Sequence, residues 1–194
     1  MATIEGTTGN DRLVGSDEDD FITGLPGNDE LLGLAGDDRL DGDDGDDELD
    51  GGAGDDRLFG DAGDDRLIGG TGNDTLYGVS GDNVISAGSG DDTIQTGTGR
   101  NDVDGGSGSD TILYTGTRAA TVDLRIQDFQ DTGIGFDRLI GVENIRGGSK
   151  ADSFTGDSGA NLLDGGDGAD TLQGDAGDDI LAGGRGNDAL DGGT

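Results

Sequence analysis

The sequence contains no cysteine and no histidine. The first absence excludes disulfide bonds, thiolate metal sites and a cysteine nucleophile; the second removes the most common general base and zinc ligand. No apolar run approaches the ~20 residues of a membrane-spanning helix, so we expect no membrane insertion. Basic residues number 11 against 44 acidic ones, giving a net charge of −33. This sign argues against binding to nucleic acid or to anionic membrane surfaces.

Apolar residues are also scarce. They make up 29% of the chain, whereas globular domains usually have about 45–50%. Low hydrophobicity combined with high net charge is typical of chains that cannot fold by burying apolar surface alone. Glycine is in excess, with 44 of 194 residues, and it recurs at a fixed short period. A fixed period predicts an ordered array, so we infer that a bound cation reconciles the composition with the order.

The repeating unit has nine residues of the form G-G-x-G-x-D-x-U-x, where U is apolar. Its cleanest copies are GGAGDDRLF, GDAGDDRLI and GGTGNDTLY, in residues 51–77. Twelve units run without insertion from Gly6 to Leu113, and five more run from Gly147 to Asp191. We therefore predict a first block over 6–113, a non-repeat spacer with β structure over 114–146, and a second block over 147–194 that ends in a partial unit.

Each unit predicts a turn followed by a short strand. The glycines allow backbone angles with φ above zero, which a tight turn requires. The last three residues alternate out, in and out, so the U side chain faces inward. Two units complete one coil, and residues 18 apart stack in two parallel sheets around a thin apolar core. The U residues are Leu13, Ile22, Leu31, Leu40, Leu49, Leu58, Leu67, Leu76, Ile85, Ile94, Val103, Ile112, Phe154, Leu163, Leu172, Leu181 and Leu190.

The sixth residue of the unit indicates the ligand. Coils spaced ~4.8 Å apart bring the aspartate of one unit close to that of the unit 18 residues later. Two carboxylates and the carbonyl oxygens of the glycine turns form an all-oxygen cage, which suits Ca²⁺ better than Mg²⁺. One buried apolar side chain contributes only about 1.5–3 kcal/mol, less than the entropy lost by ordering nine residues. We therefore expect folding to be coupled to calcium.

The unit resembles the nonapeptide of RTX proteins, also called hemolysin-type calcium-binding repeats. The resemblance implies an all-β, right-handed parallel β-roll, a β-solenoid with calcium in its turns. It also implies a secreted, extracellular protein of Gram-negative origin that a type I secretion apparatus exports and that folds on meeting external calcium. The protein or polysaccharide partner of such a module cannot be read from the repeats.

The sixth-place residues are the predicted metal ligands, and the turn glycines supply carbonyl oxygens. Asparagine at positions 83, 101 and 161 keeps an oxygen but loses a charge, so those sites should be weak. Lys150 replaces a turn glycine and puts its turn in doubt. We expect about ten calcium ions. The predicted carboxylate ligands are Asp11, Asp20, Asp29, Asp38, Asp47, Asp56, Asp65, Asp74, Asp92, Asp110, Asp152, Asp170, Asp179 and Asp188, with the carbonyls of Gly27, Gly36, Gly45, Gly54, Gly63, Gly72, Gly90, Gly108, Gly168, Gly177 and Gly186.

Other functions fit the sequence less well. Catalysis is not expected, because the chain has neither histidine nor cysteine. One alternative is a non-catalytic part of a larger secreted RTX enzyme, toxin or adhesin. Another is an ice-binding surface, but this needs regular ranks of threonine and asparagine, and Thr8-Gly9-Asn10 and Thr71-Gly72-Asn73 are isolated. The leading interpretation is a calcium-binding module that serves as a folding switch, a secretion aid or a spacer.

Three expectations concern the remaining side chains. The fifth-place aspartates should be solvated turn residues. Arginines on the outer strand face should balance neighbouring glutamates such as Glu30 and Glu48. Phe59 and Tyr77, which lie 18 residues apart, should stack on one outer face. In the spacer, the segments around Val122 and Leu139 should form strands that continue or cap the roll.

Overall fold

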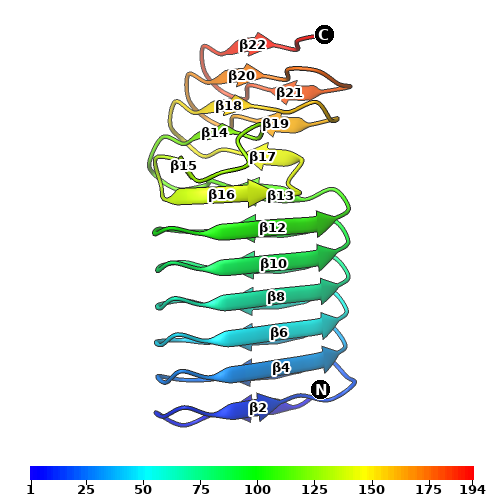
Figure 1. The fold of residues 1–194 in the computed structure, drawn as a ribbon, viewed down its shortest axis with the longest axis vertical. Coiled ribbons are helices and arrows are strands. Elements are labelled where there is room, and N and C mark those ends of the chain that lie inside the picture. Colours follow the sequence, from blue (N-terminus) through cyan, green and yellow to red (C-terminus); the bar gives the residue numbers. More distant parts are fainter.

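The computed structural model describes residues 1–194 and confirms an all-β parallel solenoid of about ten turns (Figure 1). No helix is long and apolar enough to cross a membrane. The strands fall into three sheets, which we call the first, second and third sheets. The first sheet has ten strands: β1 (Thr3–Glu5), β3 (Phe21–Thr23), β5 (Arg39–Asp41), β7 (Arg57–Phe59), β9 (Thr75–Tyr77), β11 (Thr93–Gln95), β13 (Thr111–Leu113), β17 (Asn144–Arg146), β19 (Leu162–Asp164) and β21 (Ile180–Ala182).

The second and third sheets lie on the other side of the coil. The second sheet contains β2 (Arg12–Val14), β4 (Glu30–Ala35), β6 (Glu48–Ala53), β8 (Arg66–Thr71), β10 (Val84–Ser89), β12 (Asp102–Ser107), β16 (Phe136–Ile140) and the short β15 (Gln130–Asp131). The third sheet contains β14 (Thr121–Asp123), β18 (Ser153–Thr155), β20 (Thr171–Gln173) and β22 (Ala189–Asp191). Except for β15, which runs antiparallel to β16, the strands of the second and third sheets point in the same direction in Figure 1.

Within the repeat blocks, strands pair in parallel with a register of 18 residues, as in Leu40 with Leu58. This register stacks the U side chains in two apolar columns between the sheets. Leu58 and Leu67 are completely buried, and so are nearly all other members of the columns. Only the end coils differ, because they are covered on one side: Leu190 is 50% exposed. The core is therefore one apolar side chain thick on each side of the coil.

Glycine in the turns is required by close packing between coils. A Cβ atom on Gly45 would overlap the carbonyl oxygen of Gly27 in the preceding coil. The second place of the unit has a different requirement, since it adopts positive φ in most turns. It does so even where a larger side chain is present, as at Leu34, with φ of 83°. The second place thus keeps its left-handed angles with or without glycine, whereas Gly45 at the fourth place is required by the close approach of a neighbouring backbone.

The spacer is part of the solenoid. Strand β16 pairs with β12, which aligns Leu139 with Val103, and β17 pairs with both β13 and β19. Strand β14 precedes β16 in the chain but pairs with β18, and Figure 1 places it at a level between β16 and β18. The chain therefore passes one coil ahead, returns through the antiparallel β15–β16 pair, and then resumes the coil at β17.

The outer faces carry the expected pairs. Phe59 and Tyr77 stack with ring centroids 4.8 Å apart. The guanidinium of Arg39 lies 3.9 Å from the Phe59 ring centroid, which adds a cation–π contact to that stack. Arginine–glutamate pairs bridge neighbouring strands, Arg12 to Glu30 at 2.7 Å and Arg66 to Glu48 at 3.4 Å. These exposed pairs balance charge and add little stability.

Candidate metal centre

Two columns of sixth-place residues run along the solenoid, each residue standing immediately before its strand. The first column precedes the strands of the first sheet, and the second column precedes those of the second sheet. Although they are charged or polar, most of their members are almost fully buried. In the first block the buried members are Asp20, Asp38, Asp56, Asp74, Asp92 and Asp110 in the first column and Asp29, Asp47, Asp65, Asn83 and Asn101 in the second; in the second block, Asp152, Asn161 and Asp170 are buried.

Each column is connected by a repeated hydrogen bond. The backbone N–H of Asp38 donates to Oδ1 of Asp56 at 2.8 Å, and the N–H of Asp56 donates to Oδ1 of Asp74 at 2.8 Å. The second column repeats the pattern from Asp29 to Asp47 at 2.8 Å. Carboxylates 18 residues apart therefore lie in adjacent coils, as the repeat predicts, and Asp38, Asp56 and Asp47 each have only one oxygen satisfied by the protein.

The second oxygen of these carboxylates has no protein partner. Ten sixth-place Oδ2 atoms are buried without a hydrogen bond: those of Asp29, Asp38, Asp47, Asp56, Asp65, Asp74, Asp92, Asp110, Asp170 and Asp179. Burying an unpaired charge is strongly unfavourable, and native proteins satisfy nearly all buried polar groups. A regular series of such atoms therefore indicates a bound cation.

Carbonyl oxygens complete the donor set. A Cβ atom built on Gly33 would contact both Oδ2 of Asp38 and the carbonyl oxygen of Gly51 in the next coil. At the fourth place, the carbonyl of Gly27 lies against Gly45, and the carbonyl of Gly45 lies against Gly63. No hydrogen bond within the chain ends on these two carbonyls. Carboxylate and carbonyl oxygens are the ligands that Ca²⁺ takes, so the residues present fit the ion.

The raised pKa values of the internal carboxyl groups also indicate that a buried negative charge is unfavourable at these positions. Burial, followed by repulsion from neighbouring aspartates, raises the pKa of Asp56 and of Asp65 to about 7. Burial also raises the pKa of Asp47 and of Asp74 to about 6. At neutral pH and without a cation, each of these carboxyl groups either holds a proton or carries an unfavourable buried charge.

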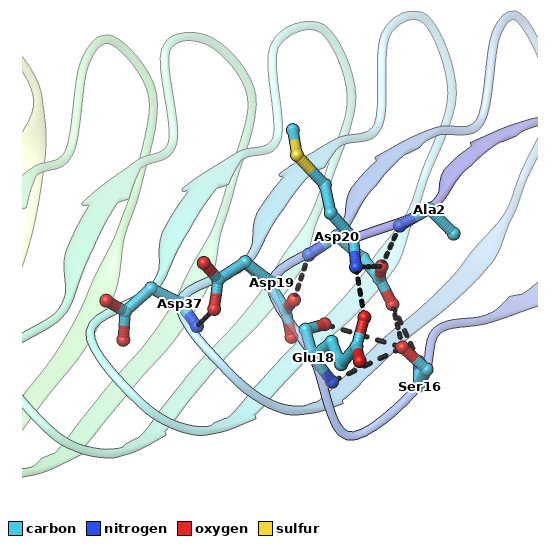
Figure 2. A network of polar contacts seen from close by, with 8 residues as sticks. Ala2, Ser16, Glu18, Asp19, Asp20 and Asp37 are labelled. Atoms are coloured by element: carbon cyan, nitrogen blue, oxygen red, sulfur yellow. Dashed lines mark hydrogen bonds and ion pairs between the residues drawn. The ribbon is translucent and has the colours of Figure 1, made fainter.

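The first coil of each block has a different turn. The N–H of Thr7 donates to Oδ2 of Asp11 at 2.6 Å, and the Thr7 hydroxyl donates to it at 2.8 Å. Ser16 makes the same two contacts with Asp20, both at 2.8 Å (Figure 2). In the second block, the Gly148 N–H donates to Oδ2 of Asp152 at 3.1 Å. The structure therefore places these three predicted ligands in turns where the protein itself satisfies the carboxylate.

The asparagine positions and the last coil also depart from the internal pattern. Asn83 accepts the Asp65 N–H at 2.9 Å but presents no anionic oxygen. Asn161 accepts the N–H of Asp157, the second-place residue of its own turn, at 2.8 Å. Asp188 stands in the last coil, where it accepts the Asp170 N–H at 3.0 Å and is only half-buried. Most of the buried carboxylate oxygens without a partner thus lie in the internal coils of the first block, and two more, those of Asp170 and Asp179, lie in the second.

The fifth-place residues are more ordered than expected. The N–H of Asp55 donates to Oδ1 of Asp37 in the preceding coil at 2.9 Å, and the N–H of Asn73 donates to Oδ1 of Asp55 at 2.7 Å. Figure 2 shows the start of this ladder, where the Asp37 N–H donates to Asp19 at 3.1 Å. These side chains are exposed, but they also connect the coils. The direction of the ladder is opposite to that of the sixth-place column.

Two acidic residues of the spacer enter the columns without having been predicted. Asp137 follows Asn101 in the second column, and Glu143 follows Asp110 in the first. Asp137-Arg138-Leu139 and Glu143-Asn144-Ile145 each place an acid two residues before a buried apolar residue, as the repeat does. That spacing was the available signal, but it was hidden by the missing glycine turns.

One further acidic group was missed, and it lies outside the columns. The carboxylate oxygens of Asp41, Asp43 and Asp61 lie within 4.8 Å of one another. Asp41 also pairs with Arg39 at 3.0 Å, which offsets part of the repulsion.

Comparison with known proteins agrees with this geometry. A family model described as RTX calcium-binding nonapeptide repeat (four copies) matches residues 5–40, 24–58, 41–76, 77–112, 139–172 and 164–194. The matches cover most of the chain. No curated protein matches the sequence.

Proposed function

The chain belongs to the RTX calcium-binding nonapeptide repeat family and forms a calcium-binding β-roll, and from that premise we propose that calcium is what allows it to fold. The observation that carries this proposal is the series of ten buried Oδ2 atoms without a partner. At neutral pH, folding without an ion would bury these charges uncompensated. Folding with the ion converts the same charges into ligands.

The proposed role is that of a secreted structural module without catalytic activity. About ten ions would occupy the internal turns, with the Oδ2 atoms and turn carbonyls as ligands. Extracellular calcium modules bind in the range of about 10⁻⁴–10⁻³ M, so a chain exported in unfolded form through a type I apparatus would fold on reaching external calcium. Such a module would serve as a folding switch, a secretion aid or a rigid spacer.

The test is circular dichroism during a calcium titration at neutral pH, with magnesium as the control. We expect coil in excess chelator and β structure at millimolar Ca²⁺. Magnesium should be a poor substitute, because it requires a tighter octahedral shell and gives up its waters reluctantly. A chain that is fully β-structured in excess chelator at neutral pH would contradict the proposal.

A further inference from the structure

The spacer contains a turn that is three residues shorter than its counterpart in the preceding coil. Ile140 aligns with Asp104 and Asn144 aligns with Thr111, so residues 141–143 stand where the preceding coil has the six residues 105–110. Strand β17 nevertheless keeps the register of the first sheet, with Ile145 aligned to Ile112. The residue before β17 therefore occupies a sixth place in the first column, although no G-G-x-G-x-D motif precedes it.

Glu143 makes the contact that aspartate makes in the other coils. The N–H of Asp110 donates to Oε2 of Glu143 at 2.9 Å, and the N–H of Asp92 donates to Oδ1 of Asp110 at 2.9 Å. The geometry of the column is thus preserved across the change from repeat to spacer. Glutamate makes this contact from a turn that has three residues fewer than the repeat turn before β13.

On the other side of this junction, the carboxylate of Asp110 has a buried oxygen without a hydrogen-bond partner. This oxygen is Oδ2, and Asp110 is fully buried. A Cβ atom on Gly105 would lie 2.8 Å from that Oδ2 and would also contact the carbonyl oxygen of Gly141. The same construction on Gly33 meets an aspartate Oδ2 and a carbonyl of the next coil within the repeats. The Asp110 carboxylate and the Gly141 carbonyl therefore converge as their counterparts do.

The second column shows that this arrangement is not a general property of the spacer. There Asp137 is also fully buried, but its Oδ1 accepts from Asn101 Nδ2 at 2.8 Å. Its Oδ2 accepts from the hydroxyls of Thr132 at 3.0 Å, Tyr114 at 3.2 Å and Thr96 at 3.3 Å. Protein donors satisfy both oxygens of Asp137, so the second column ends there without a need for a cation.

We propose that Asp110, Glu143 and the Gly141 carbonyl form a calcium site inside the non-repeat segment, which extends the first column by one ion. This inference rests on the proposed function, because it requires the other turns to bind calcium. It adds an ion that the repeat pattern does not count, and it assigns a ligand role to a glutamate outside the nonapeptides.

The test is the calcium count of the full chain by native mass spectrometry, supported by titration calorimetry, for wild type and Glu143→Gln. Glutamine keeps an oxygen that can accept the Asp110 N–H but loses the charge, so a merely structural role would survive the change. Glu48→Gln is the matched control, because Glu48 lies on the exposed outer face of the second sheet. We expect Glu143→Gln to bind one ion fewer, or to bind one ion at least ~10-fold more weakly, and Glu48→Gln to match wild type.

A second variant, Glu143→Asp, separates a direct ligand from a general effect of charge. It keeps the charge but shortens the reach, so a direct ligand predicts the same loss as in Glu143→Gln; it also decides the question if Glu143→Gln does not fold. A wild-type count in both variants, with calcium binding otherwise intact, would overturn this inference alone. A wild type that binds no calcium would overturn the proposed function and this inference with it.

Discussion

The first coil of the roll and the coils that follow it contain the same sixth-place aspartate but satisfy it differently. In the first coil the second-place residue donates its N–H to the carboxylate, as Ser16 does to Asp20. In the following coils the second place adopts positive φ, as at Leu34, and Oδ2 of Asp38 remains without a partner. One motif thus gives a self-satisfied turn at the start of the stack and an ion-binding turn inside it.

The largest effect that should separate the two regions is the loss of one internal charge. Asp56→Asn should raise the calcium concentration at the folding midpoint about tenfold, equivalent to ~1.4 kcal/mol, because Asp56 presents a buried Oδ2 without a partner. Asp11→Asn, in the first coil, should change the midpoint much less, because Thr7 already satisfies that carboxylate. Circular dichroism titrations of both variants measure the difference, and equal shifts would remove the distinction between the two kinds of turn.

The next effect concerns pH in the absence of calcium. The pKa of Asp56 is raised from its ordinary value of 3.8 to about 7 in the folded state, so the folded chain holds protons that the unfolded chain releases. In the absence of calcium, the stability that the protonated Asp56 carboxyl contributes is therefore present near pH 4 and is lost as the pH rises to about 7. We expect β structure to appear in chelator as the pH falls from 7.5 to 4.5, measured by circular dichroism.

The first coil should not contribute to that acid effect. Hydrogen bonds from Ala2 and Ser16 lower the pKa of Asp20 below its ordinary value, so its contribution is lost only on further acidification. Asp20→Asn should therefore leave the gain of β structure between pH 7.5 and 4.5 unchanged, whereas Asp56→Asn should reduce it. If acidification in chelator produces no β structure, the buried charges are not what prevents folding.

The smallest effect is on the backbone at the second place. Leu34→Gly removes a side chain from a residue with φ of 83° and should stabilise the calcium-bound protein by about 1 kcal/mol, since left-handed angles cost a non-glycine residue roughly 1–2 kcal/mol. Thr7→Gly in the first coil should have the opposite sign, because it removes the hydroxyl that donates to Asp11. Urea unfolding at saturating calcium gives both values; a loss of stability in Leu34→Gly would show that its side chain outweighs the strain.

The sequence was sufficient for the parts of the fold that follow from the period. A nine-residue unit with one inward residue fixes the register of Leu40 on Leu58 and the stacking of Asp38 on Asp56. The same regularity predicted the stack of Phe59 on Tyr77. These predictions needed only that successive coils be equivalent.

What could not be predicted depends on places where coils are not equivalent. The return of β16 beneath β14 requires contacts between segments distant in sequence, such as Tyr114 with Asp137, and no local pattern encodes them. The closed turns at Thr7 and Ser16 depend on hydrogen bonds from the second-place residue to the carboxylate, which the motif letters do not record. Glu143 was missed because the turn before it has three residues in place of the six-residue glycine turn of the repeat.

The most direct measurement is hydrogen exchange of the internal coils at pH 7.5, with calcium and with excess chelator. Strand β7 (Arg57–Phe59) is bonded on both sides to neighbouring coils and follows the unsatisfied carboxylate of Asp56. If calcium supplies the missing partner of these buried oxygens, peptides covering β7 will be protected in calcium and will exchange like an unfolded chain in chelator. Equal protection in the two conditions would contradict the account, because it would show that the internal coils fold with their charges uncompensated.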